Sequence, residues 1–122
     1  MNDTMNIGIV GAGTMGSGIA ALCAIKGYKV VLYDIEQAAV SKAEDKIEKI
    51  FSRQKDHSAG ETAFYAQAAE QIKYATDISE LGDCSLIIEA VFEDLDTKKS
   101  IFSRLESFVP AETVLATNTS SL

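Results

Sequence analysis

A glycine-rich turn between two apolar segments constrains the fold of this chain more than any other feature. Ile7–Val10 is apolar except for one glycine, as in a strand covered on both faces, and the sequence Gly11-Ala-Gly13-Thr-Met-Gly16 follows it directly. A helical pattern of apolar residues then begins near Thr14 and continues to about Lys26, where Gly27 is expected to end it. A second strand at Lys29–Tyr33 completes a right-handed βαβ unit.

Each glycine of the turn has its own physical role if the turn binds a dinucleotide. Gly11 permits the tight turn, Gly13 lets the backbone approach a pyrophosphate, and Gly16 lets the helix lie close on the strand. The positive end of the helix dipole and its N–H groups suit a diphosphate, although the turn contains no Lys or Arg. Gly18, inside the helix, costs ~1 kcal/mol relative to Ala, which close strand packing or ligand approach would explain.

An acidic residue, Asp34, ends the second strand 18 residues after Gly16. A carboxylate there can accept hydrogen bonds from both ribose hydroxyls of an adenosine, and it would repel a 2′-phosphate, so NAD is favoured over NADP. Asp34 could instead be the N-cap of the next helix, with Gln37 three residues later, or serve in both roles. The glycines alone could form an ordinary turn, but the whole combination indicates nucleotide binding.

Strands and helices alternate along the rest of the chain. A helix is expected over about Gln37–Arg53, then a loop over Ser52–Gly60, then a third helix that a capping box of Ser58 and Glu61 would start and that runs to Gln71. Two helices are too long for a minimal crossover and predict an excursion from the sheet. The remaining expected elements are strands at Ile72–Ala75, Ser85–Glu89 and Thr113–Thr117, a capped turn at Thr76–Leu81, and a helix from about Asp94 that ends before Pro110.

This alternation predicts an α/β fold of the Rossmann type, a doubly wound parallel sheet with strand order 3-2-1-4-5, formed by residues 1–122 as one domain. A hydrophobic content of 47% agrees with a single folded core, and a net charge of −7 argues against nucleic-acid or anionic-membrane partners. Neither a signal peptide nor a membrane span is recognisable, so a cytoplasmic or organelle-matrix location is expected. Cys23 and Cys84 are expected as reduced thiols without a metal, and the sole histidine, His57, as a surface residue.

Ligands of such sheets bind beyond the carboxyl ends of the strands, where the strand order reverses. Three segments should converge there: the glycine turn, Glu89–Glu93 and Ala116–Leu122. Glu89, Glu93 and Asp94 could each be a cap or a loop carboxylate, and the polar residues 118–121 could form an ordinary turn. Chemistry alone therefore indicates only that these segments line a pocket.

Three motifs carry a resemblance to a known family over the whole chain. They are Gly11-Ala-Gly-Thr-Met-Gly-Ser-Gly-Ile-Ala20 with Tyr33-Asp34, Ile88-Glu-Ala-Val-Phe-Glu93 with Lys98, and Thr117-Asn-Thr-Ser-Ser-Leu122. Together they resemble the NAD-binding domain of 3-hydroxyacyl-CoA dehydrogenases, especially the bacterial 3-hydroxybutyryl-CoA type. The first motif is common to many Rossmann proteins, whereas the last two, in this order and spacing, are quite specific. The resemblance implies NAD-dependent oxidation of an L-3-hydroxyacyl-CoA to the 3-oxoacyl-CoA, in fatty-acid β-oxidation or a short-chain acyl-CoA pathway.

The resemblance also implies roles for individual residues. Glu93 and Lys98 match cofactor contacts, Asn118 matches a residue on the nicotinamide side, and Ser120 matches the catalytic serine that hydrogen-bonds the 3-oxygen of the substrate. Lys98 could instead pair with Asp94 four residues earlier. The residues implied to hold the ADP half of NAD are Gly11, Ala12, Gly13, Thr14, Met15, Gly16 and Asp34.

The family's general base is a histidine in a His-Phe-Phe-Asn-Pro-like segment, and an all-helical domain closes its acyl site; neither is found in these 122 residues. The chain is therefore expected to be a truncated enzyme, inactive alone, whose uncovered surfaces favour homo-oligomers. Ile50 stands where a CoA-contacting serine is sought, so no CoA contact is assigned. The alternative is a non-catalytic dinucleotide-sensing module, which would not need the polar Asn118–Ser120 loop.

Overall fold

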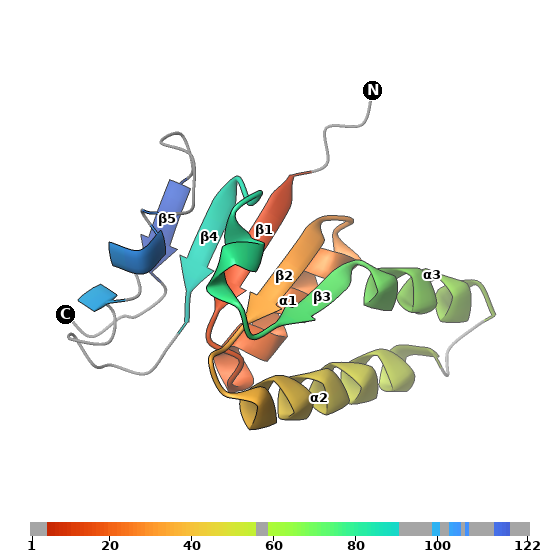
Figure 1. Ribbon diagram of the computed structural model, residues 1–122. Coiled ribbons are helices and arrows are strands. Elements are labelled where there is room, and N and C mark those ends of the chain that lie inside the picture. Colours follow the sequence, from red (N-terminus) through yellow and green to blue (C-terminus); the bar gives the residue numbers. More distant parts are fainter. Residues whose placement is uncertain are drawn as a thin grey trace.

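A five-stranded parallel sheet with the order β3-β2-β1-β4-β5 organises the computed structural model (Figure 1). The structure describes residues 5–55, 59–90, 99–100, 103–105, 107 and 114–117. The strands are β1 (Asn6–Val10), β2 (Lys29–Tyr33), β3 (Ile72–Ala75), β4 (Leu86–Glu89) and β5 (Val114–Thr117). All four strand pairs are parallel, as expected from the alternation of strands and helices.

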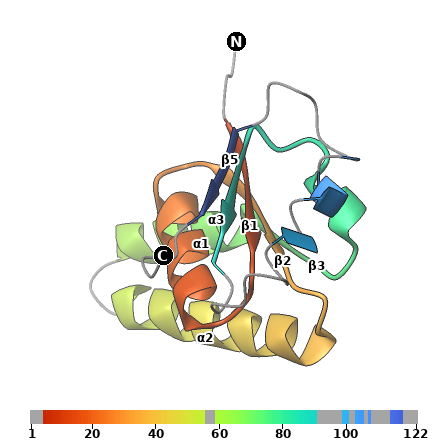
Figure 2. The same ribbon diagram turned by 90° about the vertical axis from the view of Figure 1, so that its left-hand side faces the viewer.

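Helices lie on both faces of the sheet, which confirms the doubly wound architecture (Figure 2). On one face are α1 (Thr14–Ile25), α2 (Gln37–Lys55) and α3 (Ala59–Glu70). The short 3-10 helix η1 (Ile78–Leu81) and the helical residues 103–105 lie on the other face.

Two hydrophobic clusters fill the two faces because side chains alternate along β1. Ile7 and Ile9 pack with α1, α2 and α3, whereas Val10 packs with Leu81 of η1 and with Leu105. Every residue of β1 from Ile7 onward is buried. A strand buried on both faces must be apolar on both, which explains why β1 has only apolar residues and one glycine from Ile7 onward.

The excursion after β2 is an antiparallel pair of helices, α2 and α3, that extends past the β3 edge of the sheet (Figure 1). Buried Phe51 of α2 contacts Tyr65 of α3 with ring centroids 5.8 Å apart. The expected loop over Ser52–Gly60 is too long, because α2 continues to Lys55 and α3 already begins at Ala59. The polar residues 53–55 are good helix formers, so the helix continues although its apolar pattern has ended.

The predicted end of the third helix can be compared with α3, whereas its predicted capping box cannot. His57 and Ser58 lie outside the described residues, so the surface position of His57 and the capping box are not tested. The helix ends at Glu70, one residue before the expected limit.

The C-terminus of α1 forms a Schellman motif centred on Gly27. This glycine has a φ angle of +96°, its N–H donates to the carbonyl of Ala24 at 3.0 Å, and the N–H of Tyr28 donates to the carbonyl of Cys23 at 3.1 Å. A residue with a Cβ would be strained at this φ, so the expected stop at Gly27 is confirmed for a conformational reason.

The shorter elements also follow their local signals. Asp77 caps η1 by accepting a 3.0 Å hydrogen bond from the N–H of Ser79, and this bond lowers the pKa of the Asp77 carboxyl. Most of the helix expected after Asp94 lies outside the described residues. Within the described part of the chain, no helix is long and apolar enough to cross a membrane.

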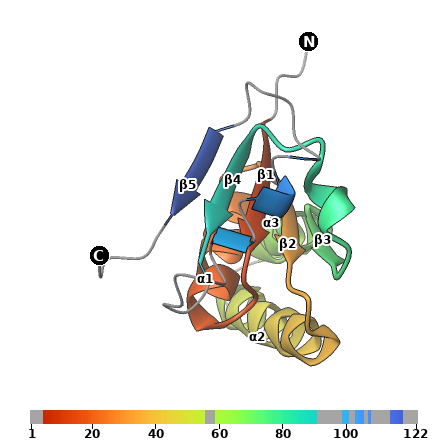
Figure 3. The ribbon, with the colours of Figure 1, turned by 60° about the vertical axis from the view of Figure 1, so that its left-hand side comes forward.

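The carboxyl ends of β1, β4 and β5 all lie at the edge of the sheet where α1 begins (Figure 3). In the register, Val10 of β1 lies beside Glu89 of β4, and Glu89 lies beside Thr117 of β5. The strand order reverses between β1 and β4, so this edge is the position at which a sheet of this kind binds ligands.

Candidate nucleotide site

The glycine turn leaves β1 through a residue that only glycine adopts easily. Gly11 has a φ angle of +110°, and its N–H donates a 2.8 Å hydrogen bond to the carbonyl of Tyr33 at the end of β2. This bond continues the pairing of β1 and β2 by one step beyond the strands. The tight turn expected at Gly11 is confirmed.

Gly16 lies against the backbone of the turn itself. A Cβ built on Gly16 would be 1.8 Å from the carbonyl oxygen of Gly11 and 2.9 Å from its carbonyl carbon. No rotation of a side chain could relieve this overlap, because both contacted atoms belong to the backbone. Gly16 therefore allows α1 to start at Thr14, immediately after the turn, as the sequence predicts.

Gly13 differs from its two neighbours in the motif because the protein leaves the space beside it open. A Cβ on Gly13 would have no atom within 4 Å, and the φ and ψ angles of −79° and −162° suit any residue. Packing and backbone strain therefore give no reason for a glycine here. A ligand lying against the turn does give one, since a side chain would occupy the space that the ligand needs.

The N-cap residue of α1 has no side chain with which to cap the first turn. Gly13 is the N-cap residue and so offers no side-chain acceptor, and no acidic residue occupies the first turn. The carbonyl of Gly13 is used internally, where it accepts from the N–H of Ser17 at 2.9 Å and from its hydroxyl at 2.7 Å. An anion at this helix terminus would meet N–H groups and the positive end of the helix dipole.

Asp34 connects the turn to the end of β2. Its Oδ2 accepts a 2.9 Å hydrogen bond from the N–H of Ala12, and its Oδ1 accepts a 2.9 Å hydrogen bond from the N–H of Glu36. The N-cap interpretation of Asp34 is wrong in position. The first helical bond of α2 runs from Val40 to the carbonyl of Glu36, so Asp34 forms a turn just before the cap. Each carboxylate oxygen keeps a second lone pair that can accept from a ribose hydroxyl.

Gly18 is not explained by close packing on a strand. It is exposed, and a Cβ on it would meet no atom within 4 Å. That part of the expectation is wrong, because Gly18 lies on the side of α1 that faces away from the sheet.

A lysine of α2 reaches the turn, and no sequence pattern predicts this contact. Nζ of Lys46 donates a 2.9 Å hydrogen bond to Oγ1 of Thr14, across 32 residues. The burial of Ala43 and Ile47 orients α2 so that Lys46 lies beside the start of α1. The sequence shows that apolar stripe, but it does not show which helix will lie opposite the residue next to it.

Glu89 is fully buried at the end of β4, at the point where the strand order reverses. The next residue, Ala90, donates a 2.8 Å hydrogen bond to the carbonyl of Val10. Glu93, Lys98, Asn118 and Ser120 lie outside the described residues, so their roles stay predictions.

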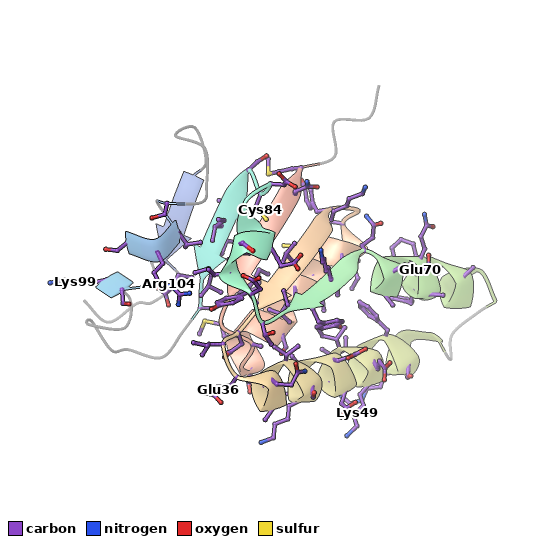
Figure 4. The ribbon with its side chains drawn as sticks, viewed as in Figure 1. Glu36, Lys49, Glu70, Cys84, Lys99 and Arg104 are labelled. Carbon is purple, nitrogen blue, oxygen red and sulfur yellow. The ribbon has the colours of Figure 1, made fainter. Side chains whose placement is uncertain are left out.

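Figure 4 shows where three labelled side chains lie relative to the sheet. Glu36 lies at the start of α2, Lys49 points away from the sheet, and Cys84 lies on the η1 side. Cys23 and Cys84 are not joined in a disulfide, Cys84 is buried, and burial raises the pKa of its thiol to about 11. Among the described residues, no group of three or more His, Cys, Asp or Glu side chains is placed to hold a metal ion.

Comparisons with known proteins agree with this geometry. Residues 6–122 match the family described as "3-hydroxyacyl-CoA dehydrogenase, NAD binding domain". A probable 3-hydroxyacyl-CoA dehydrogenase of Caenorhabditis elegans is 37% identical over 96% of this chain and 40% of its own length. A probable 3-hydroxybutyryl-CoA dehydrogenase of Deinococcus radiodurans is 36% identical over 97% of this chain and 42% of its own length.

A solved structure confirms the fold. The crystal structure of 3-hydroxybutyryl-CoA dehydrogenase from Escherichia coli K12 has a TM-score of 0.92 and 34% identity, covering 99% of this chain and 26% of that one. The chain spans about two fifths of the length of the curated relatives above. The turn, the acidic strand end and the sheet agree with the family match, and the chain belongs to the family of 3-hydroxyacyl-CoA dehydrogenase NAD-binding domains.

Proposed function

We propose that the glycine turn and Asp34 hold the ADP half of NAD in this chain. The observation that carries the proposal is the contrast between two glycines. The backbone of Gly11 occupies the space beside Gly16, whereas Gly13 faces open space at a helix terminus whose N-cap residue has no capping side chain. The residues present therefore fit a diphosphate that lies against Gly13 and accepts hydrogen bonds from the first turn of α1.

Asp34 would bind the adenosine ribose. Its two oxygens are already positioned by the N–H groups of Ala12 and Glu36, and their remaining lone pairs can accept from the two ribose hydroxyls. A 2′-phosphate would bring negative charge against this carboxylate, which favours NAD over NADP.

The reaction follows from the family and is proposed for the whole protein of which such a domain is part. NAD, when bound, accepts a hydride from the 3-carbon of an L-3-hydroxyacyl-CoA. Glu93, Lys98 and Asn118 are proposed to contact the cofactor, and Ser120 to hydrogen-bond the 3-oxygen of the substrate. Proton removal requires a general base. By the resemblance, this base is a histidine that the matched residues do not include.

The substrate, the oligomeric state and the cellular location are likewise proposed for the whole protein. An acyl-CoA is the proposed substrate, in agreement with the names of the relatives. A homo-oligomer in the cytoplasm is the proposed state. Sedimentation velocity measures the oligomer directly, and a single monomeric boundary at micromolar concentration would contradict it.

Calorimetric titration with NAD and NADP tests the site. The protein is expected to bind NAD more tightly than NADP, and Asp34→Ala is expected to weaken NAD binding while reducing the difference between the two cofactors. Asp45→Ala, an exposed carboxylate on α2, is the matched control. Equal affinity of the Asp34→Ala variant and the unmodified protein for NAD would refute the proposed ribose contact.

A further inference from the structure

The ammonium group of Lys46 is a cation that the fold places beside the proposed diphosphate site. It donates to the hydroxyl of Thr14, the first residue of α1, although the two residues are 32 positions apart. Within the described part of the chain, Lys46 makes no ion pair with a carboxylate. Its charge is therefore not neutralised by the residues described around it.

The distance from this ammonium to a bound phosphate can be bounded from the covalent geometry. A phosphate oxygen that accepts from the N–H of Thr14 would lie one hydrogen bond from that nitrogen, and the hydroxyl of Thr14 lies beside the same nitrogen. Nζ of Lys46 is 2.9 Å from that hydroxyl oxygen. The ammonium would then lie within two hydrogen-bond lengths plus the roughly 3 Å between the nitrogen and the hydroxyl oxygen of Thr14, in all ~9 Å, of the phosphate oxygen; this is shorter than the Debye length of ~10 Å at 0.1 M salt.

We propose that Lys46 is a phosphate-binding residue of the nucleotide site, and that its ammonium pairs with the cofactor's diphosphate from the α2 side. The inference rests on the proposed function, because it requires the diphosphate to lie at the start of α1. It adds a charged contact from a different helix to a turn that has no Lys or Arg of its own. With a net charge of −7, the protein otherwise repels an anionic ligand at long range.

Lys46 is exposed, so it can move from the hydroxyl of Thr14 to a phosphate oxygen without unfolding any part of α2. The four-carbon stem of lysine makes this a change of rotamer. The alternative position for the cation is the 2′-phosphate of NADP beside Asp34, and the two positions predict different ligand preferences.

The test is calorimetric titration of NAD, NADP and ADP against Lys46→Met, which keeps the length of the side chain and removes its charge. We expect a roughly threefold to tenfold rise in the Kd of NAD and of ADP, as for one exposed ion pair with a doubly charged ligand. The effect should shrink at high salt, and Lys46→Arg should retain most of the affinity. Lys49→Met is the matched control, because Lys49 lies on α2 and points away from the sheet (Figure 4).

Failure of this inference can be separated from failure of the site. If Asp34→Ala weakens NAD binding but Lys46→Met behaves like Lys49→Met, the Lys46 contact is refuted and the site stands. If Lys46→Met weakens only NADP, the cation faces the 2′-phosphate and the diphosphate contact is refuted. If the unmodified protein binds neither NAD nor ADP, both proposals are refuted.

Discussion

The N–H of Ala12 donates a 2.9 Å hydrogen bond to Oδ2 of Asp34, which ties the glycine turn to the end of the neighbouring strand. The other oxygen of the same carboxylate accepts from the N–H of Glu36, just before α2. One side chain therefore fixes the relative positions of the turn after β1 and the turn after β2. Those two turns are the segments proposed to hold the diphosphate and the ribose.

Removing this carboxylate should destabilise the protein even without a ligand. Asp34→Ala leaves the buried N–H of Ala12 without its acceptor, so we expect a loss of about 1–3 kcal/mol in the free energy of unfolding. Asp34→Asn keeps one acceptor oxygen and should lose less. Urea denaturation measures both variants, with Asp45→Ala as the control. An Asp34→Ala variant as stable as the control would show that the Ala12 bond contributes nothing net.

Two glycines of α1 should respond to alanine in opposite directions. Gly16→Ala places a Cβ 1.8 Å from the carbonyl oxygen of Gly11, so we expect a loss of at least ~1–3 kcal/mol. Gly18→Ala meets no atom within 4 Å in an exposed helix position, so we expect a gain of roughly 0.5–1 kcal/mol. Thermal unfolding should show a lower Tm for the first variant and a higher Tm for the second. A Gly16→Ala protein with an unchanged Tm is incompatible with this packing.

Gly13→Ala should separate binding from folding. Its Cβ would enter open space at φ and ψ angles that alanine tolerates, so the free energy of unfolding should not fall. The same Cβ would stand where the diphosphate is proposed to lie, and we expect roughly tenfold weaker NAD binding, about 1.4 kcal/mol. Calorimetry and urea denaturation on the same preparation check both halves. Unchanged NAD affinity would place the ligand elsewhere.

The buried thiol of Cys84 should make stability fall at high pH. Its pKa is about 11 in the folded protein, against 9.0 for an unperturbed thiol, because burial disfavours the thiolate and Asp83 adds to the effect. The folded state keeps its proton longer than the unfolded state, so this contribution is complete below pH 9 and disappears between pH 9 and about 11.

Urea denaturation at pH 8 and pH 10 measures this dependence. Cys84→Ala should be less stable at pH 8, because it loses buried volume, but it should lose less stability between the two pH values. Tyr74, whose pKa burial raises to about 12, contributes equally to both proteins. Identical pH dependence of the two proteins would contradict the proposed role of Cys84.

The sheet could be predicted from the sequence because each strand is a short, largely apolar segment and the central strand β1 is buried on both faces. β2 and β3 have the expected bounds, β1 and β4 differ from theirs by one residue, and β5 ends at Thr117 as expected, since an apolar run bounded by turn residues leaves little freedom of length. The Ser52–Gly60 loop was predicted too long because polar residues 53–55 carry no apolar pattern, yet nothing in them stops a helix.

The features of the candidate site that depend on the local backbone could be predicted from the sequence. The contacts that depend on how the helices pack could not. The roles of Gly11 and Gly16 follow from a local motif, and the structure confirms them with a φ of +110° and a 1.8 Å overlap. The contact of Lys46 with Thr14 depends on how α2 crosses α1, which no local pattern encodes. Asp34 was recognised by its position, but its bonds to Ala12 and Glu36 required the folded chain.

The bond between Ala12 and Asp34 also has a consequence for the thermodynamics of binding. A carboxylate already held by two backbone N–H groups has little rotational freedom left to lose when a ribose arrives. This part of the site is preorganised, so the entropic cost of binding comes mainly from ordering the dinucleotide, which is flexible in water. Amide hydrogen exchange at Ala12 should accordingly be slow before any ligand is added, and the ligand should slow it little further.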